Sequence, residues 1–208
     1  MVAVYIVVTI IAYLLGSISF SVIISKKIAG FDVREKGSGN AGSTNVLRTV
    51  GKKAAALTLL CDILKGVVAV GVAWIASLIW KEASGALMVQ LAAGAVVLGH
   101  TFPIYFGFKG GKGVATALGV LLICNWQIGL ICLVFALAIM AVTRIVSLGS
   151  IMAAILYPVL TLFISQNYIV DGNYLIFSIL LAVLVVYNHR TNLKRILEGK
   201  ENKLSFHK

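Results

Sequence analysis

The chain has 208 residues, of which 60% are hydrophobic and 12% are charged, and its formal net charge is +11. An average soluble domain is about 45–50% apolar and about 25% charged. This composition therefore excludes an ordinary soluble protein and indicates that a lipid bilayer surrounds much of the chain. The positive charge is typical either of a nucleic-acid-binding protein or of the cytoplasmic loops of a membrane protein, and the placement of the basic residues distinguishes the two.

The N-terminal residues 1–24 carry no charged side chain. A cleaved signal peptide would begin with basic residues and continue with about 7–15 apolar residues, so we predict a retained membrane-spanning helix over residues 1–25. Further apolar runs lie at residues 54–80, 83–108, 113–143, 145–170 and 172–188. A spanning helix needs about 20 apolar residues, so each run except 113–143 is expected to be a single span.

The run at residues 113–143 is long for one span and has the polar Asn125 and Gln127 near its middle. If it forms a hairpin of two short helices that turns at residues 125–127, then 17 of the 18 Lys and Arg residues share one side of the membrane and only Lys81 lies opposite. A single span would divide these residues 10 to 8. Because Lys and Arg prefer the cytoplasmic side, the hairpin is favoured.

We therefore predict an all-α, polytopic membrane protein with about seven transmembrane helices, some of them short, an N-terminus outside and a cytoplasmic C-terminus. Residues 1–208 are expected to form a single membrane-embedded domain, because no loop is long enough to fold alone. The basic residues are spread over separate loops of one face, which suits an anionic substrate or anionic lipid headgroups rather than nucleic acid.

The first polar loop contains the sequence GSGNAGSTNVLR at residues 37–48. It matches the dinucleotide pattern GxGxxG formally, but that fingerprint requires a preceding strand in a βαβ unit, and here a membrane helix precedes it. Glycines allow backbone N–H groups to converge on a phosphate, and we expect a helix to begin near Thr44 with Arg48 one turn later. A flexible linker is the alternative, and it does not account for the Asn and Arg positions. The candidate ligands are Ser38, Asn40, Gly42, Thr44, Asn45 and Arg48.

The second polar loop, residues 99–116, contains the sequence KGGKG at residues 109–113. It departs from a Walker A loop in the spacing before Gly111-Lys112, and Gly113 stands where Ser or Thr would bind magnesium. Nucleotide hydrolysis is therefore disfavoured, whereas a phosphate cradle is predicted. The alternative is a basic turn at the membrane surface. The candidate ligands are Gly110, Gly111, Lys112, Gly113 and Val114.

Several isolated polar residues complete the candidate set. Ser147 is expected either to cap a helix or to bind substrate, and Asn188 and His189 end the last span on the same face, where His can act as a base or phosphate ligand. Asp62 and Lys65 are spaced i, i+3 and are predicted to form a structural pair that orients nearby loop residues. A structural role is favoured for His100, and the three cysteines are expected to be reduced packing residues. No metal or other cofactor is predicted.

Residues 37–48, 99–116, 144–150 and 188–192 together resemble the motifs of the PlsY family, the acyl-phosphate:glycerol-3-phosphate acyltransferases of bacterial cytoplasmic membranes. The resemblance implies a seven-helix membrane enzyme that transfers a fatty acyl group from acyl phosphate to the sn-1 hydroxyl of glycerol 3-phosphate. The products would be lysophosphatidic acid and inorganic phosphate, in the first acylation step of phospholipid biosynthesis. Neither acyl-CoA nor acyl-carrier protein would serve as the donor.

The resemblance also implies roles for individual residues. It assigns Asn40, Gly42, Thr44, Asn45 and residues 110–114 to the phosphoryl group of acyl phosphate. It assigns six residues to glycerol 3-phosphate, namely Ser38, Arg48, Lys112, Ser147, Asn188 and His189. The catalytic set would be Lys112, Arg48, His189 and Ser38.

Direct attack by the substrate hydroxyl is predicted, because acyl phosphate is already activated and the sequence has no evident activated nucleophile. The proton acceptor is either His189 or a phosphate oxygen of the donor.

The expected partners are the two substrates and membrane lipids, without nucleic acid or nucleotide. The protein is expected to act as a monomer in the bacterial inner membrane, with its active site facing the cytoplasm. The main alternative is a transporter of an anionic phosphorylated solute, although transporters bind substrate near the membrane midplane. A lipid-binding or scaffold protein would leave the glycine-rich loops unexplained.

Overall fold

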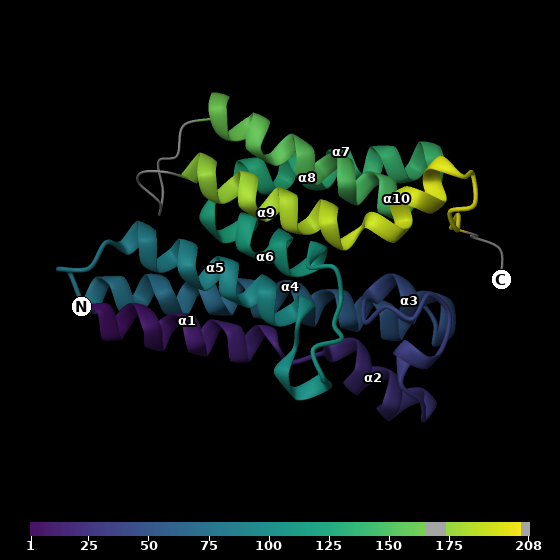
Figure 1. The fold of residues 1–208 in the computed structure, drawn as a ribbon, viewed down its shortest axis with the longest axis horizontal. Coiled ribbons are helices and arrows are strands. Elements are labelled where there is room, and N and C mark those ends of the chain that lie inside the picture. Colours follow the sequence, from purple (N-terminus) through teal and green to yellow (C-terminus); the bar gives the residue numbers. More distant parts are fainter. Residues whose placement is uncertain (165–173, 205–208) are drawn as a thin grey trace. The chain divides into compact units, whose positions relative to one another are not determined.

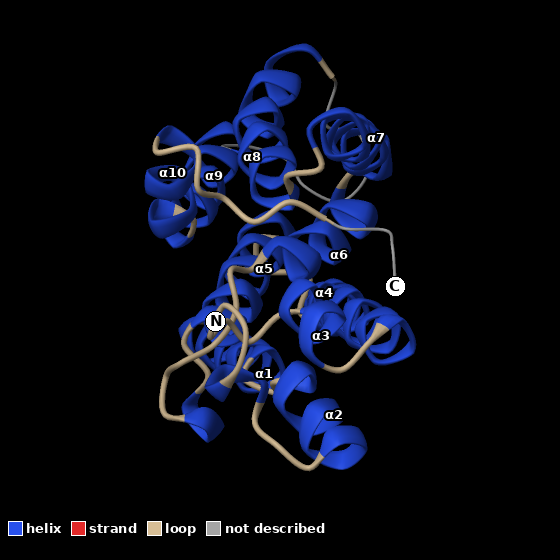
Figure 2. Ribbon diagram, turned by 90° about the vertical axis from the view of Figure 1, so that its right-hand side faces the viewer, coloured by secondary structure: helices blue, strands red, loops and turns tan. Residues whose placement is uncertain are grey.

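A computed structural model describes residues 1–164 and 174–204, and the described residues form helices and loops without strands (Figures 1 and 2). The predicted all-α architecture is confirmed. In chain order the elements are α1 (Val2–Gly16), α2 (Phe20–Ala29), η1 (Val33–Glu35), α3 (Ser43–Thr49), α4 (Lys52–Ile79), α5 (Gly85–Thr101), η2 (Ile104–Phe106), α6 (Val114–Cys124), α7 (Trp126–Thr143), α8 (Val146–Phe163), α9 (Tyr174–Asn188) and α10 (Arg190–Leu197).

The chain divides into two compact units, residues 1–124 and residues 125–208. In the first unit α1, α4 and α5 pack against one another side by side, and α6 lies along α4 (Figure 1). The short helices α2 and α3 also contact α4. In the second unit α8 contacts α7, α9 and α10. The single-domain organisation stays a prediction.

Five helical segments of the described chain are long and apolar enough to cross a membrane, or six if the bent pair α9 and α10 counts as one span. The membrane architecture is thus supported, while the predicted number of seven spans and the orientation of the termini stay predictions. The helix α6 has 11 residues and is about 17 Å long. It is therefore too short to cross a hydrocarbon core of about 30 Å.

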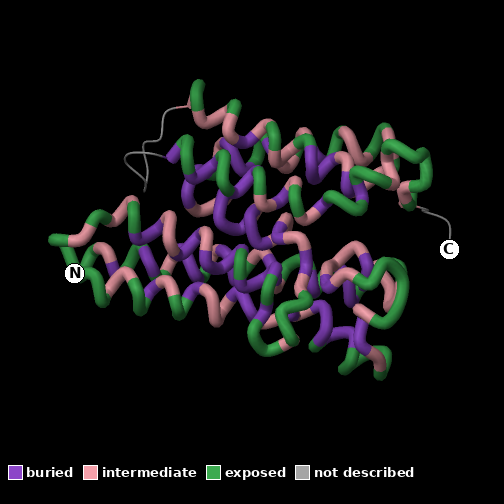
Figure 3. The backbone as a smooth tube through the Cα atoms, in the orientation of Figure 1, coloured by how far each residue is buried: buried purple, intermediate pink, exposed green. Residues whose placement is uncertain are grey.

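The helix α4 shows why the first unit suits lipid. From residue 57 onward, large apolar side chains are exposed every three or four residues, whereas the opposite face is buried and consists mainly of small residues. Figure 3 shows the alternation of exposed and buried positions along the backbone. This is the reverse of a soluble helix, which turns its apolar stripe to the core. The exposed stripe consists of Leu57, Leu60, Leu64, Val68, Val72, Ile75 and Ile79.

Glycines set the close helix contacts of the first unit. A Cβ atom on Gly16 of α1 would overlap the carbonyl oxygen of Val96 on α5, and one on Gly119 of α6 would overlap the carbonyl oxygen of Ile63 on α4. Small residues at such contacts allow the backbones of membrane helices to approach one another. This close packing holds α5 and α6 in place, and the second polar loop connects these two helices.

Two breaks interrupt the apolar runs. Within the run at 113–143, α6 ends at Cys124 and α7 begins at Trp126, which agrees with the predicted turn. Asn125 caps α7 by accepting a hydrogen bond from the N–H of Ile128 at 3.1 Å. The prediction that both helices would be short is wrong for α7, which has 18 residues. The span predicted over residues 1–25 lies within one candidate membrane span, Val2–Ala29, although the helix within it is interrupted between α1 and α2.

Lys65 provides the physical reason for the break between α1 and α2. Its Nζ atom donates hydrogen bonds to the carbonyl oxygens of Gly16 at 3.0 Å and Ile18 at 2.8 Å. Carbonyl groups at a helix end have no partner within the helix, and inside a bilayer they need one from the protein. Lys65 also pairs with Asp62, 2.9 Å away, so the predicted structural pair is present.

Candidate active site

The first glycine-rich loop is organised around the side chain of Asn45, which is 1% exposed at the start of α3. Its Nδ2 atom donates toward the carbonyl oxygens of Val33, Lys36 and Asn40 at 2.8–3.1 Å. Its Oδ1 atom accepts a hydrogen bond from the N–H of Ser38 at 2.9 Å. One amide group therefore fixes the path of the loop that carries the candidate phosphate ligands.

Replacing Asn45 by alanine is expected to destabilise the protein, because each buried polar group left without a partner costs about 1–3 kcal/mol. We expect a thermal midpoint in detergent that is lower by roughly 4–8 °C, which corresponds to about 2 kcal/mol in a chain of this size. The matched control is Asn40→Ala, because Asn40 holds the loop through its carbonyl group rather than its side chain. Equal midpoints for the two variants would contradict this role of Asn45.

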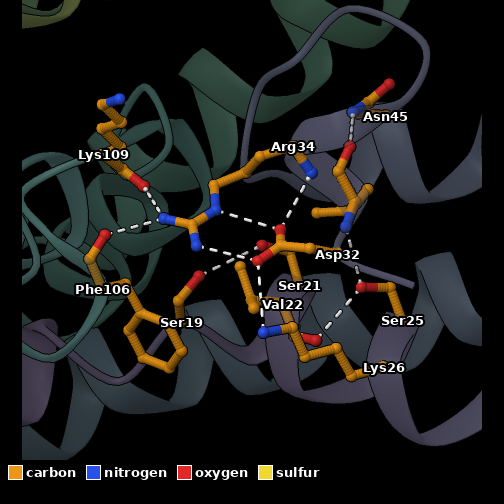
Figure 4. A network of polar contacts seen from close by, with 11 residues as sticks. Ser19, Ser21, Val22, Ser25, Lys26, Asp32, Arg34, Asn45, Phe106 and Lys109 are labelled. Atoms are coloured by element: carbon orange, nitrogen blue, oxygen red, sulfur yellow. Dashed lines mark hydrogen bonds and ion pairs between the residues drawn. The ribbon is translucent and has the colours of Figure 1, made fainter. Parts of the chain in front are cut away.

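Arg34 joins the first loop to the second (Figure 4). Its Nη1 atom donates hydrogen bonds to the carbonyl oxygens of Phe106 at 2.7 Å and Lys109 at 3.1 Å. Its Nε and Nη2 atoms donate to the two carboxylate oxygens of Asp32 at 3.0 and 2.8 Å. The bidentate pair fixes the guanidinium plane, so this interaction ties the start of the KGGKG sequence to the segment that follows α2.

The ion pair between Asp32 and Arg34 makes the stability of the folded state depend on pH. The hydrogen bonds from the side chain of Arg34 lower the pKa of Asp32 from 3.8 to about 2, against the opposing effect of burial. A carboxyl group whose pKa is depressed in the folded state stabilises that state above the unfolded pKa and loses the contribution as the pH falls through the folded pKa.

The thermal midpoint of Asp32→Asn is therefore expected to lie below that of the unmodified protein at pH 7. The gap in thermal midpoint should narrow from about pH 4 downward and become small near pH 2, because Asp32 is then protonated in the unfolded state and increasingly protonated in the folded state. Thermal unfolding of both proteins in detergent at pH 7, 4 and 2.5 measures this difference in thermal midpoint. A gap that stays constant over this range would contradict the depressed pKa.

The second loop pairs with the end of α5. The N–H groups of Gly110 and Gly111 donate to the carbonyl oxygens of Thr101 and His100 at 3.1 and 3.0 Å. These two amides are therefore engaged within the protein. The following Gly113 has φ +86° and directly precedes Val114, the first residue of α6. Because the first N–H groups of a helix have no partner within it, the start of α6 is the part of this loop best suited to a phosphate.

Gly111 brings the two loops together. A Cβ atom at this position would lie 2.5 Å from the carbonyl oxygen of Ala41 in the first loop and would overlap Nε2 of His100. Ala41, His100 and Gly111 are all buried. The first unit therefore holds the two predicted phosphate loops in van der Waals contact, which sequence reasoning predicted only as two loops on one face.

The charged candidates of the first unit lie on these loops. Lys112 is half-buried between Gly111 and Gly113, and Arg48 is exposed in the last turn of α3. The helix α3 begins at Ser43 with Gly42 as its N-cap residue, which confirms the helix start predicted near Thr44. Ser38 is exposed. The arrangement gathers backbone amides, hydroxyl groups and two cationic side chains, which is suited to neutralising a phosphate group.

In the second unit Ser147 is buried near the start of α8, and its hydroxyl group donates to Glu201 Oε1 at 2.9 Å. Asn192 Nδ2 and Arg195 Nε donate to the same carboxylate at 2.6 and 2.7 Å. Burial alone would raise the pKa of Glu201, but the hydrogen bonds from Arg195, Asn192 and Ser147 outweigh it and the pKa lies below its usual range. Glu201 thus anchors the C-terminal segment to α8 and α10.

Asn188 ends α9, and His189 follows at a bend of 60° before α10. The His189 ring is buried, and its Nδ1 atom lies 2.7 Å from the carbonyl oxygen of Val185. Because a carbonyl oxygen only accepts hydrogen bonds, Nδ1 carries a proton, and in the neutral ring Nε2 is then the basic nitrogen. This tautomer would allow His189 to accept a proton or a hydrogen bond from a substrate hydroxyl.

Sequence reasoning missed three residues that shape these regions, namely Asp32, Arg34 and Glu201. Asp32 and Arg34 read as ordinary loop charges, and Glu201 as part of a solvated basic tail. Only their tertiary partners give them a structural role. Among the described residues no group of three or more His, Cys, Asp or Glu side chains could hold a metal ion, and the absence of a metal from the reaction stays a prediction.

The fold and these loops define a multi-pass helical membrane protein with basic, glycine-rich loops suited to a phosphate. A family model described as glycerol-3-phosphate acyltransferase matches residues 6–199. The chain therefore belongs to the glycerol-3-phosphate acyltransferase family. It is 46% identical over 200 residues to the glycerol-3-phosphate acyltransferase of Clostridioides difficile (strain 630), covering 96% of this chain and 95% of the relative. It is 45% identical to that of Halalkalibacterium halodurans, covering 93% and 92% of the two chains.

A solved structure gives the same result. The crystal structure of PlsY (YgiH), an integral membrane glycerol 3-phosphate acyltransferase in its glycerol 3-phosphate form, is similar with a TM-score of 0.86 and 39% sequence identity. The match covers 97% of this chain and 96% of that one. The predicted family, the enzyme class and the multi-pass membrane location are thereby confirmed, and the transporter and scaffold alternatives are set aside.

Proposed function

We propose that the protein transfers a fatty acyl group from acyl phosphate to the sn-1 hydroxyl of glycerol 3-phosphate at the cytoplasmic face of a bacterial inner membrane. The observation that carries the proposal is the contact between the two glycine-rich loops, because Gly111, the residue before Lys112, lies against Ala41 of the first loop. The family assignment and the glycerol 3-phosphate and lysophosphatidic acid forms of the similar PlsY structures support it.

The resemblance to the PlsY family implies acyl phosphate as the donor, and the groups that the loops offer suit such a donor. A mixed anhydride already has a good leaving group, so the protein needs to bind phosphate, align the reactants and neutralise charge. The start of α6, with Gly113, Val114 and Lys112, meets those needs for the donor phosphate. The loop amides of Gly110 and Gly111 bind α5 carbonyls instead, so we assign these two glycines to shaping the cradle.

In the first loop we assign the remaining predicted ligands in the same way. The side chain of Asn45 holds loop carbonyls, so its contribution to the phosphate site is to set the loop path. Asn40, Gly42 and Thr44 are proposed to face the donor phosphate. Ser38 and Arg48 are proposed to bind glycerol 3-phosphate together with Lys112. From the second unit, Ser147, Asn188 and His189 keep the assignment to glycerol 3-phosphate that the resemblance implies.

The proposed step is a direct acyl transfer. The sn-1 hydroxyl oxygen forms a bond to the acyl carbonyl carbon, and the bond from that carbon to the phosphate oxygen breaks. Inorganic phosphate leaves with the bonding electrons, and lysophosphatidic acid is formed. The hydroxyl proton passes to the departing phosphate or to Nε2 of His189, while Lys112 and Arg48 stabilise the developing negative charge.

The membrane side of the reaction follows from charge placement. Basic residues concentrate in the loops of one face, and Lys and Arg prefer the cytoplasm. Glycerol 3-phosphate is water-soluble and would arrive from that side, whereas the fatty tail of the donor stays in the bilayer. The exposed apolar stripe of α4 shows that lipid can lie directly against this unit.

The test is a comparison of acyl donors with purified protein in detergent and labelled glycerol 3-phosphate. Palmitoyl phosphate should give lysophosphatidic acid and inorganic phosphate in equal amounts, with the acyl group at sn-1. Palmitoyl-CoA and palmitoyl-carrier protein should give no product above background. Product from palmitoyl-CoA at a rate similar to that from palmitoyl phosphate would contradict the proposed donor.

A further inference from the structure

Three ionisable side chains form a buried chain of contacts in the first unit. Asp62 and Lys65 on α4 and His100 on α5 are 2%, 5% and 7% exposed. Asp62 Oδ1 lies 2.9 Å from Lys65 Nζ and 3.5 Å from His100 Nδ1. Burying ionisable groups in a membrane protein is costly, and those that persist usually have a function.

The fold explains the presence of Lys65 in this buried group. Its ammonium group donates hydrogen bonds to the carbonyl oxygens at the break between α1 and α2, so Asp62 is needed there only as a counter-ion. That role does not require His100. A buried side chain that served packing alone could be apolar, and an imidazole beside the carboxylate needs its own explanation.

The His100 end of the chain faces the second glycine-rich loop. The backbone carbonyl of His100 accepts the N–H of Gly111 at 3.0 Å, and the Nε2 side of its ring closes the space in which a Cβ of Gly111 would lie. The Nδ1 side faces Asp62. The ring is therefore a spacer with a carboxylate at one edge and Gly111 at the other.

We propose that Asp62 and His100 are positioning residues for the acyltransferase reaction. The negative charge of Asp62 favours a proton on Nδ1 of His100 and fixes the orientation of the ring. The ring then sets how closely Gly111 approaches Ala41 of the first loop, and so places Lys112, the next residue. Neither side chain touches substrate in this proposal, which rests on the phosphate-binding role proposed for Lys112.

A double-mutant cycle on the kinetics tests this arrangement. His100→Ala is expected to raise the KM for glycerol 3-phosphate about tenfold, since coupled contacts contribute about 0.5–3 kcal/mol. Asp62→Asn should raise it about fivefold in the unmodified background and less than about twofold in the His100→Ala background, because residues that act through one another are not additive. Additive increases in KM would contradict the proposal.

Lys65→Met is the matched control. It breaks the same ion pair but on the side away from the loop, so the thermal midpoint should fall while the KM stays within about twofold of the unmodified value. If Asp62→Asn does not fold, the charge-balanced double variant Asp62→Asn/Lys65→Met replaces it and should still show the raised KM. A KM equal to that of the unmodified protein in either Asp62 variant, or in His100→Ala, would overturn the inference.

The readout separates this inference from the proposed function. The donor assignment fails if the unmodified protein does not use palmitoyl phosphate, whatever the variants do. The positioning role is tested only by the KM of the variants for glycerol 3-phosphate, relative to that of the unmodified protein. This KM is measured with whichever donor the unmodified protein accepts.

Discussion

Replacement of Gly111 by alanine is expected to lower kcat/KM by about 100-fold, because displacing a positioning element by about 1 Å can have an effect of that size. The new Cβ atom would lie 2.5 Å from the carbonyl oxygen of Ala41 and would overlap the ring of His100. Ala41 and His100 are both buried, and the atom of Ala41 in contact is a backbone oxygen, which cannot move away as a flexible side chain could. The two loops must therefore move apart, and Lys112 moves with the second.

The matched control for this substitution is Gly107→Ala in the same loop. Gly107 has φ +65°, and a Cβ atom there would meet nothing within 4 Å. The backbone conformation disfavours alanine by roughly 1–2 kcal/mol, so a lower thermal midpoint is expected with activity within about threefold. Initial rates with palmitoyl phosphate and glycerol 3-phosphate compare the two variants. Similar rates for both would contradict the proposed loop contact.

Lys112→Met is expected to reduce activity by about 10²- to 10³-fold, which is the usual effect of removing one preorganised group that stabilises transition-state charge. The side chain is half-buried beside Gly113 at the start of α6. Methionine keeps the length and the apolar stem of lysine, so the thermal midpoint should change by no more than about 4 °C. The lost ammonium group then accounts for the lost rate.

Lys109→Met removes the same charge from the same loop and serves as the control. Lys109 is exposed, and its contact with Arg34 is made by the backbone carbonyl, which the substitution keeps (Figure 4). Its activity should stay within about threefold of the unmodified value, because an exposed charge contributes little. An equal loss in both variants would show that general basicity of the loop matters rather than the position of Lys112.

The membrane helices could be predicted because lipid imposes a simple rule on sequence. The runs at residues 54–80 and 145–170 contain α4 and α8, and the position of Asn125 between apolar residues marked the end of α6. Local chemistry also predicted where α3 begins, since glycine and small polar residues precede it. In these cases the pattern and the structure depend on the same few neighbouring residues.

The break between α1 and α2 could not be predicted in this way. Residues 17–19 read as part of one apolar run, and their conformation depends on Lys65, almost 50 residues later in the chain. The same holds for Arg34, whose carbonyl partners belong to the other loop, and for Glu201, which binds Ser147 of α8. Tertiary hydrogen bonds of this kind leave no periodic signal in the sequence.

A single-turnover measurement tests direct transfer, on which the proposed reaction depends. Enzyme in excess over palmitoyl phosphate is first incubated without glycerol 3-phosphate, then with it, while inorganic phosphate, lysophosphatidic acid and the intact protein mass are followed. The account predicts no change in protein mass, and phosphate and lysophosphatidic acid that appear together only after glycerol 3-phosphate is added. A burst of phosphate before that addition, with a protein mass increased by one palmitoyl group, would contradict it.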